Sequence, residues 1–111
     1  MSSRLVFALF WASTATLANA EPSTAGAPDA ARQRELVRLV RQDCGSCHGM
    51  TLRGGLGPAL LPATLHDKPA EGLVATIYCG RPGTAMPPWK QFMTEAEAAW
   101  IVDQLMREFP K

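Results

Sequence analysis

The chain has 111 residues, a length that fits one domain. Its formal net charge of +1 argues against a nucleic-acid-binding protein and against a polybasic membrane-binding segment. A domain this small buries little apolar surface, so a disulfide, a metal or a cofactor usually stabilises it. The chain has three cysteines, and an odd number cannot all pair within one chain.

The first 20 residues have the pattern of a secretory signal peptide. Arg4 gives a positive start, Leu5–Leu17 is a largely apolar run, and Ala18-Asn19-Ala20 is a small-x-small cleavage sequence. The apolar run is shorter than the roughly 20 residues of a membrane-spanning helix, which favours cleavage over an uncleaved anchor. We therefore expect an exported protein that begins at Glu21 and has no stable membrane anchor.

The next segment, residues 21–31, is rich in proline, alanine and glycine and is predicted to be a flexible leader. The domain is predicted over residues 32–111. In its first part the apolar residues fall on one helical face, which predicts an amphipathic helix from Arg32 to Cys44. Residues 49–66 have the glycine and proline content of a loop. A loop of this length in a compact domain needs something to wrap around.

A second helix is predicted after this loop, with Asp67 or Lys68 as its cap and Pro69 at its first position. Gly80 is expected to end it. Its predicted apolar face consists of Leu73, Thr76 and Ile77. These positions have the i, i+3, i+4 spacing of residues on one face of a helix.

A second loop, residues 81–93, is again rich in proline. The sequence Thr94-Glu95-Ala96-Glu97 is a capping box, which predicts the start of the last helix. This helix is expected to end near Pro110. Since no segment alternates like a strand, the predicted fold is all-α, with three main helices and two long loops.

The motif Cys44-Gly45-Ser46-Cys47-His48 has the C-x-x-C-H spacing of covalent haem attachment. Two thiols three residues apart on one helical turn can both reach the haem vinyl groups, and the next residue can present its imidazole to the iron. A redox disulfide is disfavoured because the βαβ pattern that usually carries one is absent. A zinc site that adds Cys79 to this set remains an alternative, although Cys79 stands alone rather than in a second ligand cluster. The motif predicts one covalently bound haem c.

Haem iron takes a second axial ligand, and methionine is one of the few side chains used for it. Met86 follows the motif at a distance of 38 residues, in a loop stiffened by Pro87 and Pro88. These prolines can hold the sulfur in place without a helix. Met86 is therefore the predicted distal ligand and His48 the proximal one.

Other candidate ligands fit less well. Met50 follows the proximal histidine too closely to reach the far side of the haem, and Met93 and Met106 are expected in the core. His66 would give bis-histidine ligation but is predicted to be an exposed loop residue. Cys79 is predicted to be a small buried residue with an unreactive thiol, the alternative being an intermolecular disulfide.

The chain after the leader resembles class I cytochromes c in three features: the CGSCH site, Gly57-Pro58 and the Gly-x-x-Met-Pro loop. In that family the proline carbonyl accepts the second N–H of the proximal imidazole, which implies that Pro58 orients His48. Similar cytochromes place aromatic or basic groups near a haem propionate. This resemblance makes Arg81 and Trp89 candidates for that role, the alternatives being an exposed arginine and a core indole.

Two stretches, RQDCGSCHGMTLRGGLGPAL and GRPGTAMPPWKQFMTEAEAAWIVDQL, resemble the NirC-like small cytochromes encoded with cytochrome cd1 nitrite reductase in denitrifying bacteria. The resemblance implies a periplasmic monohaem cytochrome that transfers single electrons to that reductase. The alternative that it implies is an accessory redox factor in haem d1 maturation. We expect an electron-transfer protein rather than an enzyme, because Met86 would close the iron position that a peroxidase needs open. A monomer is expected.

Overall fold

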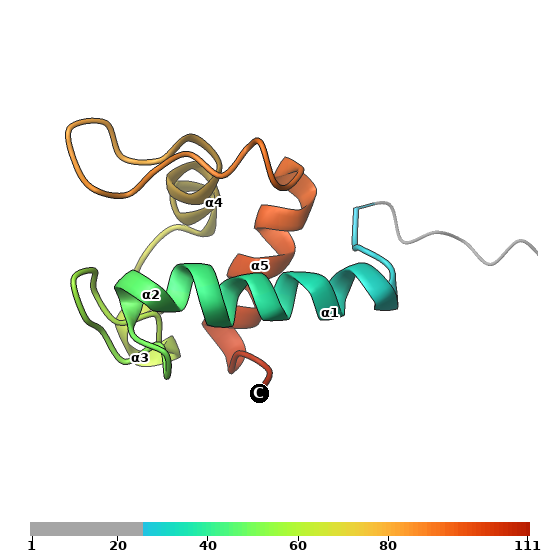
Figure 1. The fold of residues 1–111 in the computed structure, drawn as a ribbon, viewed down its shortest axis with the longest axis horizontal. Coiled ribbons are helices and arrows are strands. Elements are labelled where there is room, and N and C mark those ends of the chain that lie inside the picture. The colour runs from blue at the N-terminus through green and yellow to red at the C-terminus, as the bar shows by residue number, and fades with distance from the viewer. Residues whose placement is uncertain (1–25) are drawn as a thin grey trace, which may run out of the picture.

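The computed structural model describes residues 26–111, and every regular element among them is helical (Figure 1). The elements are α1 (Ala30–Leu39), η1 (Val40–Cys44), α2 (Gly45–His48), α3 (Pro62–Leu65), α4 (Ala70–Cys79) and α5 (Glu95–Arg107). The predicted all-α fold is confirmed for this part of the chain. No helix in residues 26–111 has the length and apolar character needed to span a bilayer. The predicted signal peptide and the first five leader residues lie outside the described residues.

The segments α1, η1 and α2 form one nearly continuous helical run that carries the C-x-x-C-H motif at its end (Figure 1). The run begins two residues before the predicted start at Arg32, because the Asp29 carboxylate accepts the backbone N–H of Arg32 at 2.8 Å and caps the helix. η1 is a π-helical turn that ends at Cys44, the first residue of the motif. Leu36 and Val40 are fully buried and fix this run to the core.

Helix α4 begins one residue later than predicted. Pro69 is the cap itself rather than the first helical residue, so the prediction that Asp67 or Lys68 caps the helix is wrong. Pro69 has extended backbone angles, and its carbonyl accepts the N–H groups of Gly72 and Leu73. Gly80 ends the helix with a φ of 71°, as the glycine predicts.

Helix α5 supplies much of the core. Its predicted capping box is confirmed: the Glu97 N–H donates to Thr94 Oγ1 at 3.2 Å, and the Thr94 N–H donates to Glu97 Oε2 at 2.8 Å. The buried face of the helix consists of Ala98, Ile101, Val102 and Leu105. It packs against α3 and α4 and shares the core with Leu36 of α1.

The core brings α1, α3 and α5 together with residues from both long loops. Leu52 and Met93 are buried in it, as are Leu65 and Phe109. Met93 was predicted to fill the core and is 5% exposed, while Met106 is half-buried against the same cluster. The predicted loop 49–66 contains the short helix α3, so the first loop of the structure is residues 49–61. The second loop is residues 80–94.

Candidate haem-binding site

A cavity of about 680 Å³ lies between α2, α4, α5 and the two loops. All seven residues that the sequence suggested for the site line it: Cys44, Cys47, His48, Pro58, Arg81, Met86 and Trp89. Three separate segments contribute them. The remaining lining is largely apolar, and it includes the α4 face of Leu73, Thr76 and Ile77 that the sequence predicted. The fold therefore gathers two thiols, an imidazole and a thioether around one apolar space.

The imidazole of His48 is held by the first loop. Its Nδ1–H donates to the Pro58 carbonyl oxygen at 2.6 Å, which leaves Nε2 with a free lone pair. Gly57 packs so closely against the ring that a Cβ at this position would lie 2.8 Å from both Nδ1 and Cε1. The hydrogen bond and the close approach fix the ring in one orientation. This is the arrangement expected around a histidine that binds metal.

The first loop is also bonded to the backbone of the motif. The Gly54 N–H donates to the His48 carbonyl at 2.7 Å, and the Gly57 N–H donates to the Cys47 carbonyl at 2.8 Å. Leu52 anchors the loop in the core at 2% exposure. The loop that follows the motif therefore folds back onto it and satisfies carbonyls at the end of α2.

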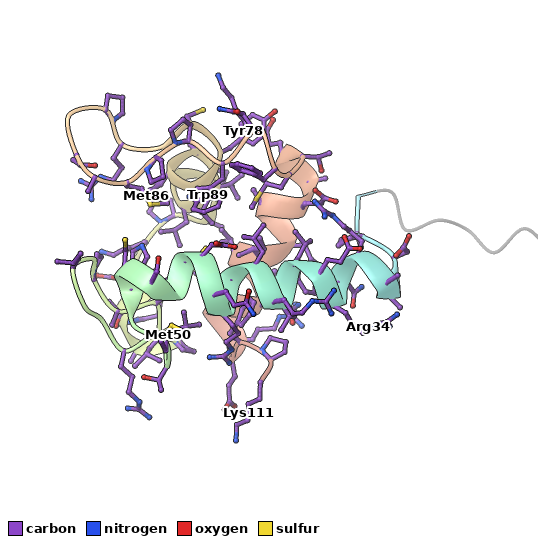
Figure 2. All side chains as sticks on the ribbon, in the orientation of Figure 1. Arg34, Met50, Tyr78, Met86, Trp89 and Lys111 are labelled. Atoms are coloured by element: carbon purple, nitrogen blue, oxygen red, sulfur yellow. The ribbon has the colours of Figure 1, made fainter. Side chains whose placement is uncertain are left out.

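Met86 comes to the cavity from the second loop. The Arg81 N–H donates to the Met86 carbonyl at 3.1 Å. Gly80 approaches this segment so closely that a Cβ would lie 2.9 Å from the Met86 carbonyl oxygen and 2.6 Å from the Pro88 nitrogen. In Figure 2, Met86 lies beside the second loop above α2, whereas Met50 lies below α2. Met50 is 63% exposed and does not line the cavity.

Trp89 places a hydrogen-bond donor at the cavity without a protein acceptor. Its Nε1 is the one buried side-chain polar atom of residues 26–111 that lacks a partner. Its ring lies against Phe92, with centroids 5.6 Å apart. A buried donor of this kind needs an acceptor, and a haem propionate would supply one. Arg81, which is exposed at the same cavity, adds a positive charge. These donors, together with the sulfur and imidazole groups, fit a haem.

The Cys44 thiol is half-buried. Burial raises its pKa to about 11, and the negative charge of Asp43 acts in the same direction. Neither Cys44 nor Cys47 forms a disulfide. Nowhere in residues 26–111 do three His, Cys, Asp or Glu side chains converge on a metal position. The structure therefore gives the zinc alternative no support.

Cys79 does not belong to the cavity. It is exposed, so the prediction of a small buried residue is wrong. The reason is its helical phase: two residues past Ile77 it points about 200° away from the face that borders the cavity. His66 is exposed, as predicted, and its Nδ1 bonds to the Ala63 carbonyl at 2.8 Å. It does not line the cavity.

Sequence reasoning missed several further residues of the cavity, among them Leu56 and Thr84. Leu56 is 94% exposed at the cavity mouth, and the first loop gives no sequence signal for this position because it is glycine-rich on both sides. The signal for Thr84 is its place two residues before Met86, where a hydroxyl can bond to the backbone. Met93, predicted only as a core residue, also borders the cavity.

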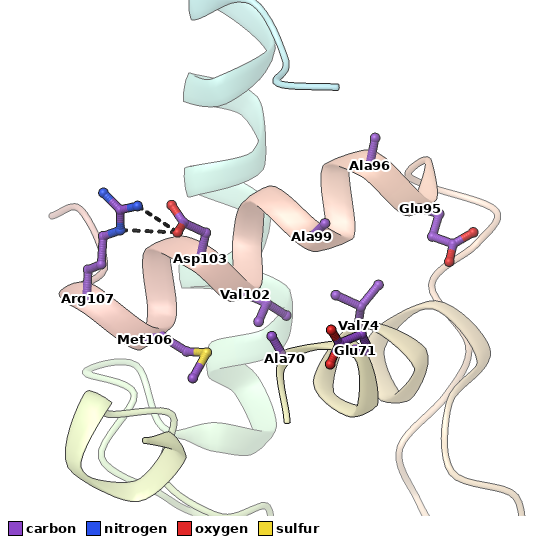
Figure 3. Close-up of a pocket in the computed structure, with 10 residues that line it drawn as sticks. All are labelled: Ala70, Glu71, Val74, Glu95, Ala96, Ala99, Val102, Asp103, Met106 and Arg107. Atoms are coloured by element: carbon purple, nitrogen blue, oxygen red, sulfur yellow. Dashed lines mark hydrogen bonds and ion pairs between the residues drawn. The ribbon is translucent and has the colours of Figure 1, made fainter. Parts of the chain in front are cut away.

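A second hollow, of about 760 Å³, lies between α4 and α5 (Figure 3). Its lining combines small apolar residues with charged ones: Ala70, Glu71, Val74, Glu95, Ala96, Ala99, Val102, Asp103, Met106 and Arg107. Asp103 and Arg107 form an ion pair at 2.9 Å on α5. The groove contains none of the residues predicted for the haem site.

Comparisons with known proteins identify the family of this chain. The family model described as cytochrome c oxidase, cbb3-type, subunit III matches residues 31–104. Cytochrome c55X of Pseudomonas aeruginosa is 58% identical over 79 residues, which cover 71% of this chain and 66%, just under two thirds, of that relative.

Two solved structures are also similar. The c-type cytochrome NirC is 54% identical with a TM-score of 0.74, and the match covers 76% of this chain and 100% of NirC. The dihydro-haem d1 dehydrogenase NirN is 35% identical with a TM-score of 0.60, over 67% of this chain and 16% of that protein. The match to the family model spans both C-x-x-C-H and Met86. The chain therefore belongs to this family of c-type cytochromes, with the small class I fold and covalently bound haem c.

Proposed function

We propose that this cytochrome is a periplasmic carrier of single electrons, with His48 and Met86 as the axial ligands of its haem iron. The observation that carries the proposal is that both side chains line one apolar cavity although they lie 38 residues apart. The haem supplies one-electron redox chemistry, and a thioether ligand keeps its potential high. Covalent attachment at Cys44 and Cys47 suits a carrier because it prevents loss of the cofactor.

The remaining residues of the cavity support this chemistry in different ways. The Pro58 carbonyl orients His48 and raises the basicity of its Nε2. Trp89 and Arg81 offer donors to the propionates, and the apolar lining keeps water away from the iron. With His48 and Met86 both bound to the iron, no coordination position would remain for a substrate. These features favour electron transfer over catalysis.

Cytochrome cd1 nitrite reductase is the proposed electron acceptor. Support comes from the similarity to cytochrome c55X and NirC and from the NirC-like stretches around both predicted axial ligands. The cavity offers a contact surface, since the exposed Leu56 and the basic residues Lys68 and Arg81 all line it. Opposite charge on a partner would accelerate encounter in a salt-dependent way.

The test is a rapid-mixing experiment in which reduced holoprotein meets purified oxidised cytochrome cd1. Fast electron transfer that slows as salt is added supports the proposal. A matched pair of variants locates the contact: Lys68→Glu should slow transfer, whereas Lys111→Glu, remote at the C-terminus (Figure 2), should not. No transfer at any salt concentration would refute the reductase as partner.

A second candidate function is that of a redox factor in haem d1 maturation. The similarity to a dihydro-haem d1 dehydrogenase favours it. A dehydrogenase releases electrons, and an oxidised cytochrome could accept them one at a time. Oxidised holoprotein mixed with that dehydrogenase and its substrate should then be reduced in a substrate-dependent reaction. Reduction here, combined with no transfer to cytochrome cd1, would select this function.

Periplasmic location is tested separately from the redox partner. Mass analysis of protein from the periplasmic fraction should give a chain that begins at Glu21 and carries one haem. The same preparation should behave as a monomer in size-exclusion chromatography. Protein that retains residues 1–20 in a membrane fraction would instead indicate an uncleaved anchor.

A further inference from the structure

Thr84 bridges two points of the second loop through its hydroxyl group. Its Oγ1–H donates to the Arg81 carbonyl at 2.7 Å. The same oxygen accepts the Met86 N–H at 3.2 Å. Thr84 and Arg81 are also joined by a backbone bond, from the Thr84 N–H to the Arg81 carbonyl at 3.0 Å. One side chain therefore closes the turn and bonds to the residue that presents the sulfur.

Both backbone polar groups of Met86 are consequently satisfied inside the loop. Its N–H bonds to Thr84, and its carbonyl accepts the Arg81 N–H at 3.1 Å. The backbone of Gly80 approaches the Met86 carbonyl from the side of α4 and leaves little room for it to shift. The loop exit is bonded to the same helix, since the Trp89 N–H donates to the Ile77 carbonyl at 3.0 Å. Of these restraints on Met86, only the bond to Thr84 depends on a side chain.

We propose that Thr84 is a positioning residue for Met86, whose hydroxyl holds the Met86 backbone in the conformation that directs the sulfur to the haem iron. This inference rests on the proposed ligation of iron by Met86. In this role Thr84 contacts neither the Met86 sulfur nor the haem iron, and it acts only through the backbone of the loop.

The reason for an effect on ligation is competition between two states of the loop. When an external ligand displaces the sulfur, the segment around Met86 must leave its closed conformation. Hydrogen bonds inside the closed loop oppose that movement. Without the hydroxyl the closed state loses two bonds, and displacement of the sulfur becomes easier.

The hydrogen bond itself can be tested by amide exchange in the holoprotein. Loss of one bond of this type changes an opening equilibrium by about three- to tenfold. The Met86 amide of Thr84→Val should therefore exchange about three- to tenfold faster than in the wild type. Thr84→Ser keeps the hydroxyl and should restore slow exchange. If the Met86 amide exchanges at the same rate in all three proteins, the hydroxyl does not hold it and the proposal is wrong.

The effect on the iron is tested by titrating the ferric holoprotein with imidazole and following the weak far-red sulfur-to-iron band. Because two hydrogen bonds are lost, Thr84→Val should lose this band at an imidazole concentration about five- to a hundredfold lower. Thr84→Ser should behave like the wild type. Thr51→Val is the matched control, because Thr51 is an exposed threonine of the first loop that does not line the cavity. Equal imidazole affinity for Thr84→Val and Thr51→Val would overturn the proposal.

Failure of the proposal is distinguishable from failure of the ligand assignment. If Met86→Ala loses the far-red band before any imidazole is added, Met86 is the ligand and the Thr84 variants test positioning alone. If the band survives in Met86→Ala, the ligand assignment fails and the positioning proposal fails with it. If Thr84→Ser is as weak as Thr84→Val, the hydroxyl is not the cause and only the positioning proposal is refuted.

Discussion

The two long loops, residues 49–61 and 80–94, both line the cavity but are held in different ways. The first loop follows the C-x-x-C-H motif directly and is bonded to it through backbone groups, with Leu52 buried in the core. The second loop is far from the motif in the sequence. Its conformation around Met86 depends on the Thr84 hydroxyl and on the tightly packed Gly80. Single side-chain changes should therefore disturb the Met86 side more selectively than the His48 side.

The largest effect is expected where the motif itself is changed. Cys44→Ala or Cys47→Ala should leave little folded holoprotein, because the attached haem supplies much of the core of so small a domain. A denaturing gel stained for haem measures this, since covalent haem stays with the chain. Cys79→Ala is the matched control and should stain fully, as Cys79 lies outside the cavity. Full staining of either motif variant would contradict the attachment sites.

A change at Met86 should spare the attachment and alter only the ligation. Met86→Ala should keep haem staining but lose the far-red band, open the iron to carbon monoxide and lower the potential. Spectra of the ferric and ferrous protein measure the first two effects. The contrast with the cysteine variants would show that the cofactor is retained through the first segment and tuned through the second.

Four variants serve as controls for this assignment. The band should survive in each of them: Met50→Leu, Met93→Leu, Met106→Leu and His66→Ala. The three leucines replace packing groups of similar volume, and His66 points away from the cavity. Survival of the band in Met86→Ala, together with its loss in one of these variants, would mean that another residue is the ligand. A change caused by His66→Ala alone would indicate bis-histidine ligation.

Substitution of two glycines of the second loop separates the energetic cost of close packing from the cost of a positive φ. Gly80→Ala should lower the free energy of unfolding by about 2–4 kcal/mol, because φ is +71° and the new Cβ would meet backbone atoms at 2.6–2.9 Å. Gly83 has a φ of +78° with no atom near its Cβ position, so Gly83→Ala should cost only about 1 kcal/mol. Denaturant unfolding of the holoproteins compares them. Equal costs would show that the close approach of Gly80 is not needed.

The proximal side was predictable from sequence because its residues form a contiguous motif. Cys44, Cys47 and His48 have a fixed spacing on one helical turn, and Pro58 follows close behind. Met86 was also predictable as a candidate, since the following prolines restrict the backbone. Whether the two sets of residues meet in one cavity depends on how α4 and α5 pack. The sequence indicates this packing only through the apolar faces of the two helices.

The failures have a physical cause as well. Cys79 was placed in the core because cysteine is usually buried, but its phase on α4 decides its exposure. Pro69 was assigned to the first helical position, and the difference of one residue depends on its ψ angle, which composition does not determine. The two bonds of Thr84 depend in the same way on loop backbone angles. Helical phase accounts for the exposure of Cys79, and local dihedral angles account for the cap at Pro69 and the bonds of Thr84.

A smaller effect is expected at the end of the second loop, where a charge cluster around Arg32 adds to the backbone hydrogen bonds. Arg32 donates to both Glu97 carboxylate oxygens, at 2.7 and 3.2 Å, and to the Phe92 carbonyl at 2.8 Å. The hydrogen bond from Arg32 lowers the pKa of Glu97. Glu97→Gln should therefore reduce the free energy of unfolding by about 1–2 kcal/mol at neutral pH.

The pH dependence of this difference follows from the sign of the pKa shift. A carboxylate with a depressed folded-state pKa contributes its full stability above the unfolded value of about 4.3, and loses it as the pH falls through the folded-state pKa. The gap between wild type and Glu97→Gln should accordingly be constant from neutral pH down to about pH 5 and shrink at lower pH. Asp103→Asn is the control: its ion pair with Arg107 is exposed, so it should cost less than about 0.5 kcal/mol. Urea titrations at several pH values measure both variants, and a gap that widens in acid would show that Glu97 does not stabilise the loop exit as a carboxylate.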